Sequence, residues 1–195
     1  MPVTTAPAAS RATVRRSAIA AIVILILFVI ALHLMGRIPV CKCGVGLWTW
    51  SAWSSQTSQH LGDPYSTSHV LHGIIFFAIL AFAARRLRLD YRFLIALMIE
   101  VGWELLENSL LIINRYRSVT ASLDYTGDSI LNSTGDVLFM MLGFWLAWKL
   151  RWQWTLAIVI TTELLMLVFY RDNLTLNILM LLYPVPAIRT WQSGG

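Results

Sequence analysis

The chain has 195 residues, of which 57% are hydrophobic and 13% are charged, and its formal net charge is +5. A soluble domain carries about 25% charged residues, so this composition excludes an ordinary water-soluble globular protein. Apolar runs of about 20 residues recur, each long enough to cross about 30 Å of hydrocarbon. We therefore expect an all-α fold, a polytopic transmembrane helix bundle whose basic residues face lipid head groups rather than nucleic acid.

The chain opens with a polar stretch followed by an apolar one. Residues 1–16 are rich in Ala, Thr and Pro and carry arginines without an acid, which predicts a disordered basic tail. The run at 17–35 is too long for a signal-peptide core and no A-x-A site follows it, so it is predicted to remain as a membrane anchor. Residues 36–68 form a polar, aromatic loop.

Four further apolar runs complete a predicted bundle of about five spanning helices at 17–170. They cover 69–84, 93–113, a helix that ends near residue 150, and 154–170, with a second loop at 114–128. The segment 171–195 contains "LTLNILMLLYPVP", which is too short to span and is expected to lie in the interface or to form a short sixth helix.

Orientation follows from the basic residues, which favour the cytoplasmic side. The sequence "RRLRLDYR" at 85–92 lies between the second and third helices. It predicts a bacterial cytoplasmic-membrane protein with its N-terminus inside, its C-terminus in the periplasm and both large loops outside. Cys41 and Cys43 would then lie in an oxidising compartment, where we expect them to be oxidised or solvent-reactive rather than buried.

Several ionisable residues fall within the apolar runs, where each costs about 2.5–3.5 kcal/mol at the bilayer centre. Glu100, Glu104 and Glu107 lie within about 60° of one another on a helix, and Asn108 extends this stripe. A second polar face carries residues spaced four apart, and two histidines spaced three apart enter from the outer end of the second helix: Asp128, Asn132, Asp136, His69 and His72. Helical rise places Glu107 and Glu104 about 10 and 15 Å below Asn114, and Asp136 about 12 Å below Asp128. We therefore predict that these groups converge on an outward-facing cavity.

This pattern suggests general acid–base chemistry on a bound substrate. The candidate catalytic residues are Glu104, Glu107, Asp136, His69 and His72. The candidate binding residues are Arg115, Arg117, Tyr125, Asp128 and Asn132, and the arginines would hold an anionic head group. The alternative is that polar side chains only link helices, which we favour for the hydroxyls such as Ser129 and Ser133 and leave open for Asn132. Glu163 stands alone on its helix, and its role is left open.

Neither a metal nor a cofactor is predicted. Two histidines and several carboxylates could hold an ion within a helix bundle, but no E-x-x-H or H-E-x-x-H occurs on one helix. The single C-x-C lacks the second ligand pair of a zinc site.

The motifs "CKCG", "SSQTSQH", "YSTSHVLHG", "WELLENS", "RYRSVTASLDYTGDS" and "NSTGD" resemble an uncharacterised family of small bacterial inner-membrane proteins over about residues 36–150. One departure is at Leu47-Trp48-Thr49, where that family often has Trp-His-Gly. A local pattern over two helices, Glu104, Asn108, Arg117 and Asp128-x-x-x-Asn132-x-x-Gly135, is similar to VanZ-like membrane proteins. That second resemblance implies a lipid-linked or envelope substrate.

Three functions remain open on this sequence. The first is a membrane-embedded enzyme or binding protein acting on an amphiphile from the outer side. The second is a non-catalytic subunit or assembly factor whose polar stripe pairs with a partner membrane protein. The third is a proton- or ion-coupled carrier, which the absence of an inverted repeat disfavours.

Overall fold

The structure, a computed structural model, describes residues 11–120 and 124–194. Within these ranges the regular secondary structure is entirely α-helical, which confirms the predicted fold class. The helices are α1 (Arg11–Leu34), α2 (Ser66–Ala83), α3 (Leu89–Glu107), α4 (Leu110–Val119), α5 (Ile130–Lys149), α6 (Trp152–Tyr170), α7 (Leu174–Leu182) and α8 (Pro186–Gln192).

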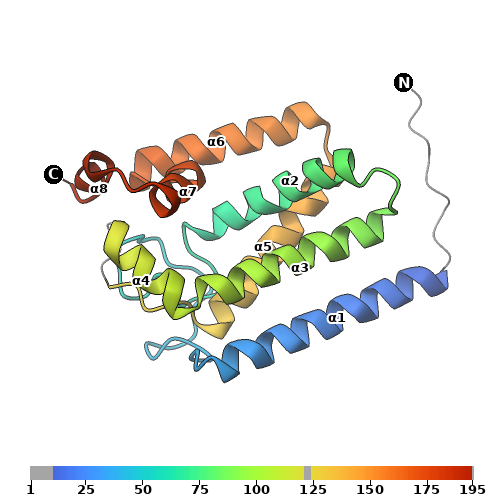
Figure 1. The fold of residues 1–195 in the computed structure, drawn as a ribbon, viewed down its shortest axis with the longest axis horizontal. Coiled ribbons are helices and arrows are strands. Elements are labelled where there is room, and N and C mark those ends of the chain that lie inside the picture. The colour runs from blue at the N-terminus through green and yellow to red at the C-terminus, as the bar shows by residue number, and fades with distance from the viewer. Residues whose placement is uncertain (1–10, 121–123, 195) are drawn as a thin grey trace.

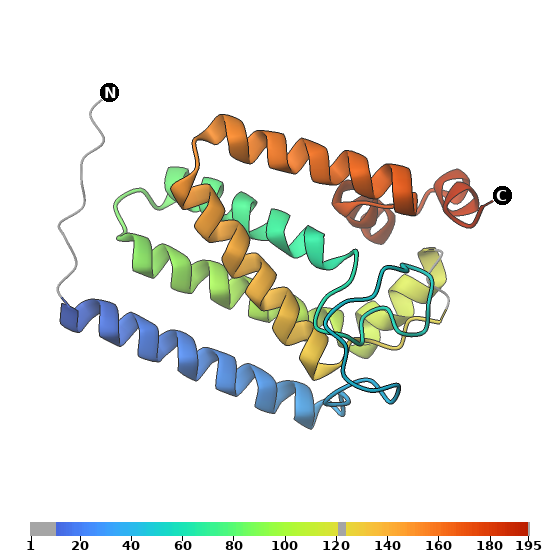
Figure 2. The ribbon, with the colours of Figure 1, turned by 180° about the vertical axis from the view of Figure 1, so that it is seen from behind.

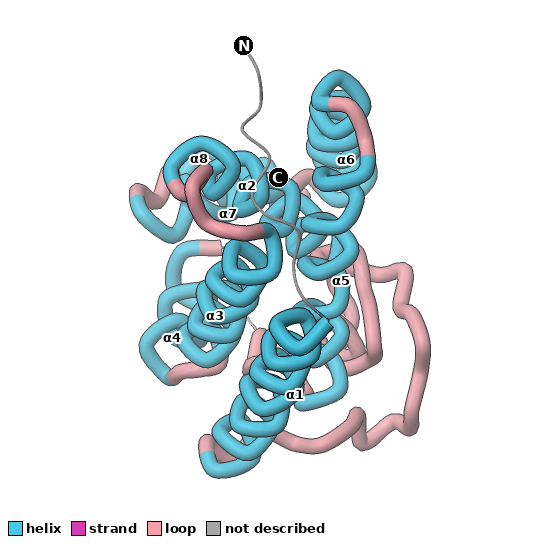
Figure 3. The backbone as a smooth tube through the Cα atoms, turned by 90° about the vertical axis from the view of Figure 1, so that its right-hand side faces the viewer, coloured by secondary structure: helices cyan, strands magenta, loops and turns pink. Residues whose placement is uncertain are grey.

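The long helices run side by side, whereas the short ones collect at one end of the molecule (Figure 1). Seen from behind, the loop at 36–65 lies at that same end with α4, α7 and α8 (Figure 2). An end-on view shows α1, α3, α5 and α6 as separate rods (Figure 3). The segments predicted to lie outside the membrane therefore share one end of the bundle, which we call the loop end.

Among the described residues, four helices are long and apolar enough to cross a membrane: α1, α2, α5 and α6. Helix α3 has 19 residues and lies among them, but its acids set it apart by composition, so its status as a fifth span stays a prediction. Helix α7 has nine residues and at about 1.5 Å per residue is too short to span.

Several boundaries differ from the sequence-based expectation; α2 and α3, for example, begin at Ser66 and Leu89 rather than at 69 and 93. The predicted disordered tail covered residues 1–16, but residues 11–16 belong to α1. Residues 1–10 of that tail lie outside the described residues. The third helix ends at Glu107 instead of near 113. Helix α4 begins inside the helix predicted at 93–113 and continues into the loop predicted at 114–128. Residues 121–123 of that loop lie outside the described residues. Ser109 caps α4 by accepting from the Ile112 amide at 3.5 Å. The continuous apolar pattern gave no sign that a new helix begins at this cap.

Helices α2 and α5 cross at a close contact made by glycines. A Cβ on Gly73 would meet the Met140 carbonyl oxygen, and a Cβ on Gly143 would meet the Val70 carbonyl oxygen. Small residues allow membrane helices to approach this closely. The crossing fixes the histidine face of α2 against the aspartate face of α5.

An apolar core packs against this polar region; its residues on α2, α3 and α5 lie farther from the loop end than the polar groups, whereas Phe28 and Leu32 come from the end of α1 nearest the loop end. It contains buried side chains of α1, α2, α3 and α5: Phe28, Leu32, Leu80, Ala96, Leu97, Val137, Met140 and Phe144. On α3 and α5, Leu97 and Met140 of this core lie within about one turn of Glu100 and Asp136.

Candidate functional site

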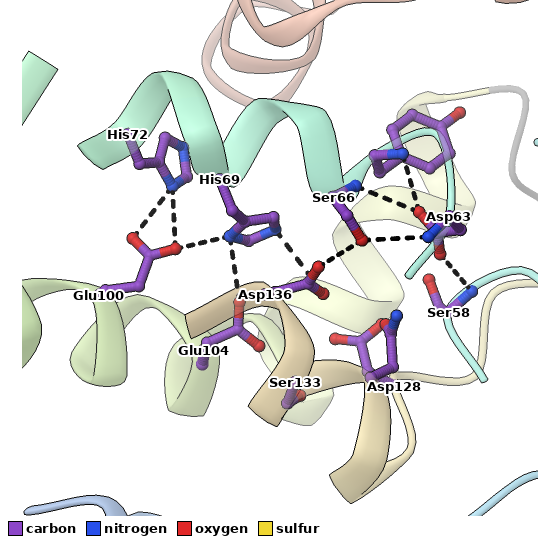
Figure 4. A network of polar contacts seen from close by, with 12 residues as sticks. Ser58, Asp63, Ser66, His69, His72, Glu100, Glu104, Asp128, Ser133 and Asp136 are labelled. Carbon is purple, nitrogen blue, oxygen red and sulfur yellow. Dashed lines mark hydrogen bonds and ion pairs between the residues drawn. The ribbon is translucent and has the colours of Figure 1, made fainter. Parts of the chain in front are cut away.

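Two histidines of α2 converge on one carboxylate of α3 (Figure 4). His69 Nδ1 lies 2.6 Å from Glu100 Oε1, and His72 Nδ1 lies 3.0 Å from Glu100 Oε2. The two rings contact each other at a centroid distance of 5.0 Å. His72 also stacks on Phe76 and meets the edge of Trp103, so aromatic neighbours fix its ring.

His69 faces two further carboxylates. Its Nδ1 lies 3.4 Å from Glu104 Oε1, and its Nε2 lies 3.9 Å from Asp136 Oδ2. Glu104 is completely buried, and neither of its carboxylate oxygens has a hydrogen-bond partner among the described residues. Three acids from two helices thus surround one imidazole.

A chain of hydrogen bonds holds Asp136 from the loop side (Figure 4). Ser66 Oγ donates to Asp136 Oδ1 at 2.6 Å and accepts from the Asp63 amide at 3.1 Å. Asp63 in turn accepts from the amides of Ser58, Tyr65 and Ser66, so it caps the start of α2. The loop therefore sets the position of the Asp136 carboxylate on α5.

The loop is also clamped directly onto α5. Asn132 Nδ2 donates to the His60 carbonyl at 2.8 Å, and Ser129 Oγ donates to the Gln59 carbonyl at 3.0 Å. Ser129 therefore caps α5 and binds the loop at once, beyond the helix-internal role expected for it. Asn132 is 1% exposed, and its amide links elements rather than standing free.

These groups line a cavity of about 630 Å³. Its inner wall carries His69, His72, Asn132 and Asp136, and residues from the loop end continue the polar lining. Its other wall carries apolar side chains of α2, α3 and α7, among them Ile75, Phe76, Ile99, Trp103, Ile178 and Leu181. Ile75 and Ile99 are 38% and 46% exposed, so the cavity reaches the outer surface of the bundle between α2 and α3.

Two acids at the loop end of the cavity are buried as well. Burial raises the pKa of Asp63 above its ordinary value, although three backbone amides oppose the shift. Burial likewise raises the pKa of Asp128, against hydrogen bonds from Tyr125, Ser58 and Asn108. No arginine or lysine is among the described residues that line the cavity. The site is thus acidic and lacks a fixed cation.

The structure brings most of the predicted site residues to this cavity. Those that line it are His69, His72, Glu107, Tyr125, Asp128, Asn132 and Asp136, with Glu104 buried behind His69. Glu107 closes α3, so it lies at the helix end rather than about 10 Å below it as helical rise suggested.

The two arginines lie elsewhere. Arg115 donates from Nε and Nη2 to the Leu181 carbonyl at 3.0 and 2.8 Å, which ties α4 to the end of α7. Arg117 donates to the Tyr125 carbonyl at 2.6 Å and is exposed. Neither is among the described cavity-lining residues, so the structure does not bring them to the cavity with the other candidates.

Sequence reasoning missed three participants. Glu100 was assigned to the acidic stripe but not to the site, yet it pairs with both histidines. Asp63 and Ser66 were overlooked because they precede the apolar run. The spacing D-x-x-S before that run is a helix N-terminus signature that could have found them.

Glu163 and the two cysteines have structural roles. Glu163 accepts from the amides of Leu174 and Thr175, and so caps α7 from α6. Cys41 and Cys43 form a disulfide, in line with one expected state. Cys41 is only 8% exposed, however, so the expectation that both cysteines are unburied is wrong for it.

The four long apolar helices make this chain a helical membrane protein, and a buried polar site lies among them. The chain belongs to the family described as protein of unknown function (DUF2585), whose model matches residues 32–194. This confirms the resemblance to an uncharacterised family. The chain is 51% identical over 177 residues to a UPF0314 protein of Rhizobium etli, covering 90% of this chain and 91% of that one.

Relatives from other genera are equally similar. A UPF0314 protein of Paracoccus denitrificans is 50% identical over 183 residues, 92% of this chain and 95% of the relative. One from Sphingopyxis alaskensis is 51% identical over 162 residues, covering 83% and 86% of the two chains. No solved structure matches the chain.

Proposed function

We propose that this protein is a multi-pass protein of the bacterial cytoplasmic membrane that binds an amphiphilic envelope component in the cavity and acts on its polar head group. One observation carries the proposal: the cavity has a buried polar inner wall and an apolar wall that reaches the lipid-facing surface. A volume of about 630 Å³ is within the usual range of about 300–1,000 Å³ for ligand sites. An amphiphile entering between α2 and α3 would keep its chain against Ile75 and Ile99 and its head group against Asn132 and Asp136.

The chemistry of the lining limits the head group. Buried carboxylates and amide oxygens accept hydrogen bonds, and an anionic group placed among them would be repelled. Trp53, Tyr65 and Tyr125 add aromatic faces, which suit sugars and amines. The head group is therefore neutral or cationic and rich in hydrogen-bond donors, as in a hydroxyl-rich or amine-bearing lipid.

Burial weighs against the two other functions. A stripe meant for a partner helix would face outward, whereas Glu100, Glu104 and Asn132 are at most 1% exposed inside this chain. A relay across the membrane needs ionisable groups along its whole path, but beyond the acids the helices α2, α3 and α5 contribute the apolar core side chains Leu80, Leu97 and Phe144. Among the described residues, the buried acids lie at or above the level of Glu100, toward the loop end.

The orientation follows from the same arrangement. The loop end would face the periplasm, because "RRLRLDYR" lies at the opposite end of the bundle. Alkaline phosphatase fusions at residues 60 and 89 test this orientation. Activity at 60 but not at 89 supports it, and the reverse pattern contradicts it.

Co-purified lipid tests the binding proposal. The protein is purified in a mild detergent, and bound lipids are extracted and quantified by mass spectrometry against the bulk membrane. Ile99→Trp would obstruct the lateral opening, while Ile160→Trp changes a similarly exposed residue, 50% exposed on α6, that does not line the cavity. We expect one enriched amphiphile per protein, reduced several-fold by Ile99→Trp and unchanged by Ile160→Trp. Equal retention by both variants, or lipid in bulk proportions only, contradicts the proposal.

A further inference from the structure

The histidine–carboxylate cluster has the composition and spacing of a metal centre. The ligand atoms of His69, His72 and Glu100 all lie within 4.8 Å of one another. Zinc and similar ions bind such atoms at about 2.0–2.2 Å, so one ion can reach all three after small side-chain movements. Two imidazoles and one carboxylate form the donor set typical of catalytic zinc and of non-haem iron.

A second, independent observation is the state of Glu104. Its carboxylate is fully buried, and its two oxygens have no hydrogen-bond partner among the described residues. A buried carboxylate without partners is costly, because desolvation is not repaid. It points at His69 Nδ1 from 3.4 Å, beside the point where the histidines and Glu100 converge. A cation at that point would supply the missing partner.

The charges around His69 lead to the same conclusion. Glu100, Glu104 and Asp136 all approach this imidazole within 3.9 Å. Among the described residues, no arginine or lysine pairs with any of the three. A divalent ion would offset most of this negative charge at the place where it is concentrated.

The surroundings also provide the outer support that metal-bound histidines require. A ligating imidazole usually directs its other nitrogen at a carboxylate or carbonyl, which fixes the ring. With Nδ1 of His69 on the ion, its Nε2 faces Asp136, which Ser66 holds by a hydrogen bond of 2.6 Å. His72 is oriented instead by Phe76 and Trp103.

We propose that His69, His72 and Glu100 bind one divalent transition-metal ion of the zinc or ferrous iron class, with Glu104 beside it. Both histidines line the cavity, whereas Glu100, which is completely buried, does not. The remaining coordination position therefore faces the cavity, where it can take water or a neutral oxygen of the head group. This inference goes beyond the proposed function and does not depend on the identity of the amphiphile.

Metal content tests the inference directly. The protein is purified in detergent, its affinity tag is removed, and metals are measured by inductively coupled plasma mass spectrometry. Demetallated protein is then reloaded with Zn²⁺, Fe²⁺, Mn²⁺ or Co²⁺ alone. We expect about one equivalent of zinc or iron, and a visible Co²⁺ spectrum of a low-symmetry site with four or five ligands.

Variants locate the ion. The double change His72→Asn with Glu100→Gln should lower stoichiometric binding at least tenfold, whereas Asp172→Asn, at a buried acid that does not line the cavity, should leave it unchanged. Circular dichroism and gel filtration establish whether each variant is folded. If the double variant does not fold, His69→Gln replaces it. Wild-type protein that neither retains nor rebinds any of the four ions overturns the proposal. Undiminished binding by a folded ligand variant overturns it as well. Either failure leaves the lipid measurement above unaffected.

Discussion

Asn108, at the break between α3 and α4, forms a reciprocal pair with Asp128, which precedes α5. Asn108 Nδ2 donates to Asp128 Oδ2 at 2.9 Å, and Asn108 Oδ1 accepts from the Asp128 amide at 2.8 Å. Asn108 also donates to Ser133 at 3.0 Å on α5. One side chain thus joins the end of α3 to the start of α5 and holds the mouth of the cavity.

Asn108→Leu should destabilise the protein by about 2–3 kcal/mol, because it removes one hydrogen bond from the buried Asp128 carboxylate and leaves the Asp128 amide without its acceptor. Thermal unfolding in detergent measures the change. The control is Asn114→Leu, at an exposed position of α4, which should change stability by about 0.5 kcal/mol or less. Equal effects of the two substitutions would show that the Asn108 contacts contribute nothing.

The glycine crossing of α2 and α5 makes a second prediction. Gly73→Ala and Gly143→Ala each place a methyl group against a backbone carbonyl of the other helix, so each should cost about 1–3 kcal/mol or more. Gly102→Ala on α3 meets open space and should be neutral, or stabilising by up to about 1 kcal/mol. Unfolding midpoints rank the three variants. A neutral Gly73→Ala would mean that the two helices are farther apart than described.

The C-terminal segment predicts a pH effect. Asp172 is buried in the turn between α6 and α7, where Gln192 Nε2 of α8 donates to it at 3.0 Å. Burial raises the pKa of Asp172 to about 6 from an ordinary value of 3.8. The folded state then binds the proton more tightly than the unfolded state does. Stability contributed by this group is therefore full below about pH 4 and is lost as the pH rises to about 6, by about 3 kcal/mol at most.

Asp172→Asn removes this titration. The difference in unfolding free energy between the variant and the wild type should therefore shift in favour of the variant as the pH rises from 4 to 7. Unfolding in detergent across that range gives both curves. Parallel curves would contradict the assignment.

Thiol labelling tests the disulfide. Wild-type protein in intact cells should react with a maleimide only after reduction, because Cys41 and Cys43 are joined. In the single variants, the cysteine left by Cys41→Ser is exposed and should react faster than the one left by Cys43→Ser, which is buried. Labelling of the wild type without reductant counts against the disulfide.

Helix positions were predictable because the apolar runs are long and charges mark their ends. The α3–α4 break was not, since "ELLENSLLII" reads as one amphipathic run and only the Asn108-Ser109 pair indicates a stop. Tertiary contacts decide there: Asn108 bonds to α5, and Ser109 starts a new helix.

The site was only partly predictable for a related reason. Helical spacing placed Glu104 and Asp136 facing a common region. It did not fix how α2 and α3 are rotated about their axes relative to each other. The pairing of Glu100 with both histidines depends on that rotation. Arg115 and Arg117 were assigned by charge alone, and the backbone carbonyls they bind leave no trace in a sequence.

The central claim is that the buried polar groups form a functional site rather than links between helices. Envelope lipid profiles of a deletion strain carrying Asp136→Asn, Glu104→Gln or Asn132→Leu, measured beside membrane abundance, test it most directly. We predict that Asp136→Asn and Glu104→Gln fail to restore the wild-type profile at near-normal abundance, because neutral isosteres lower the cost of burial. Full restoration by both variants, with abundance falling first and most for Asn132→Leu, would contradict the claim.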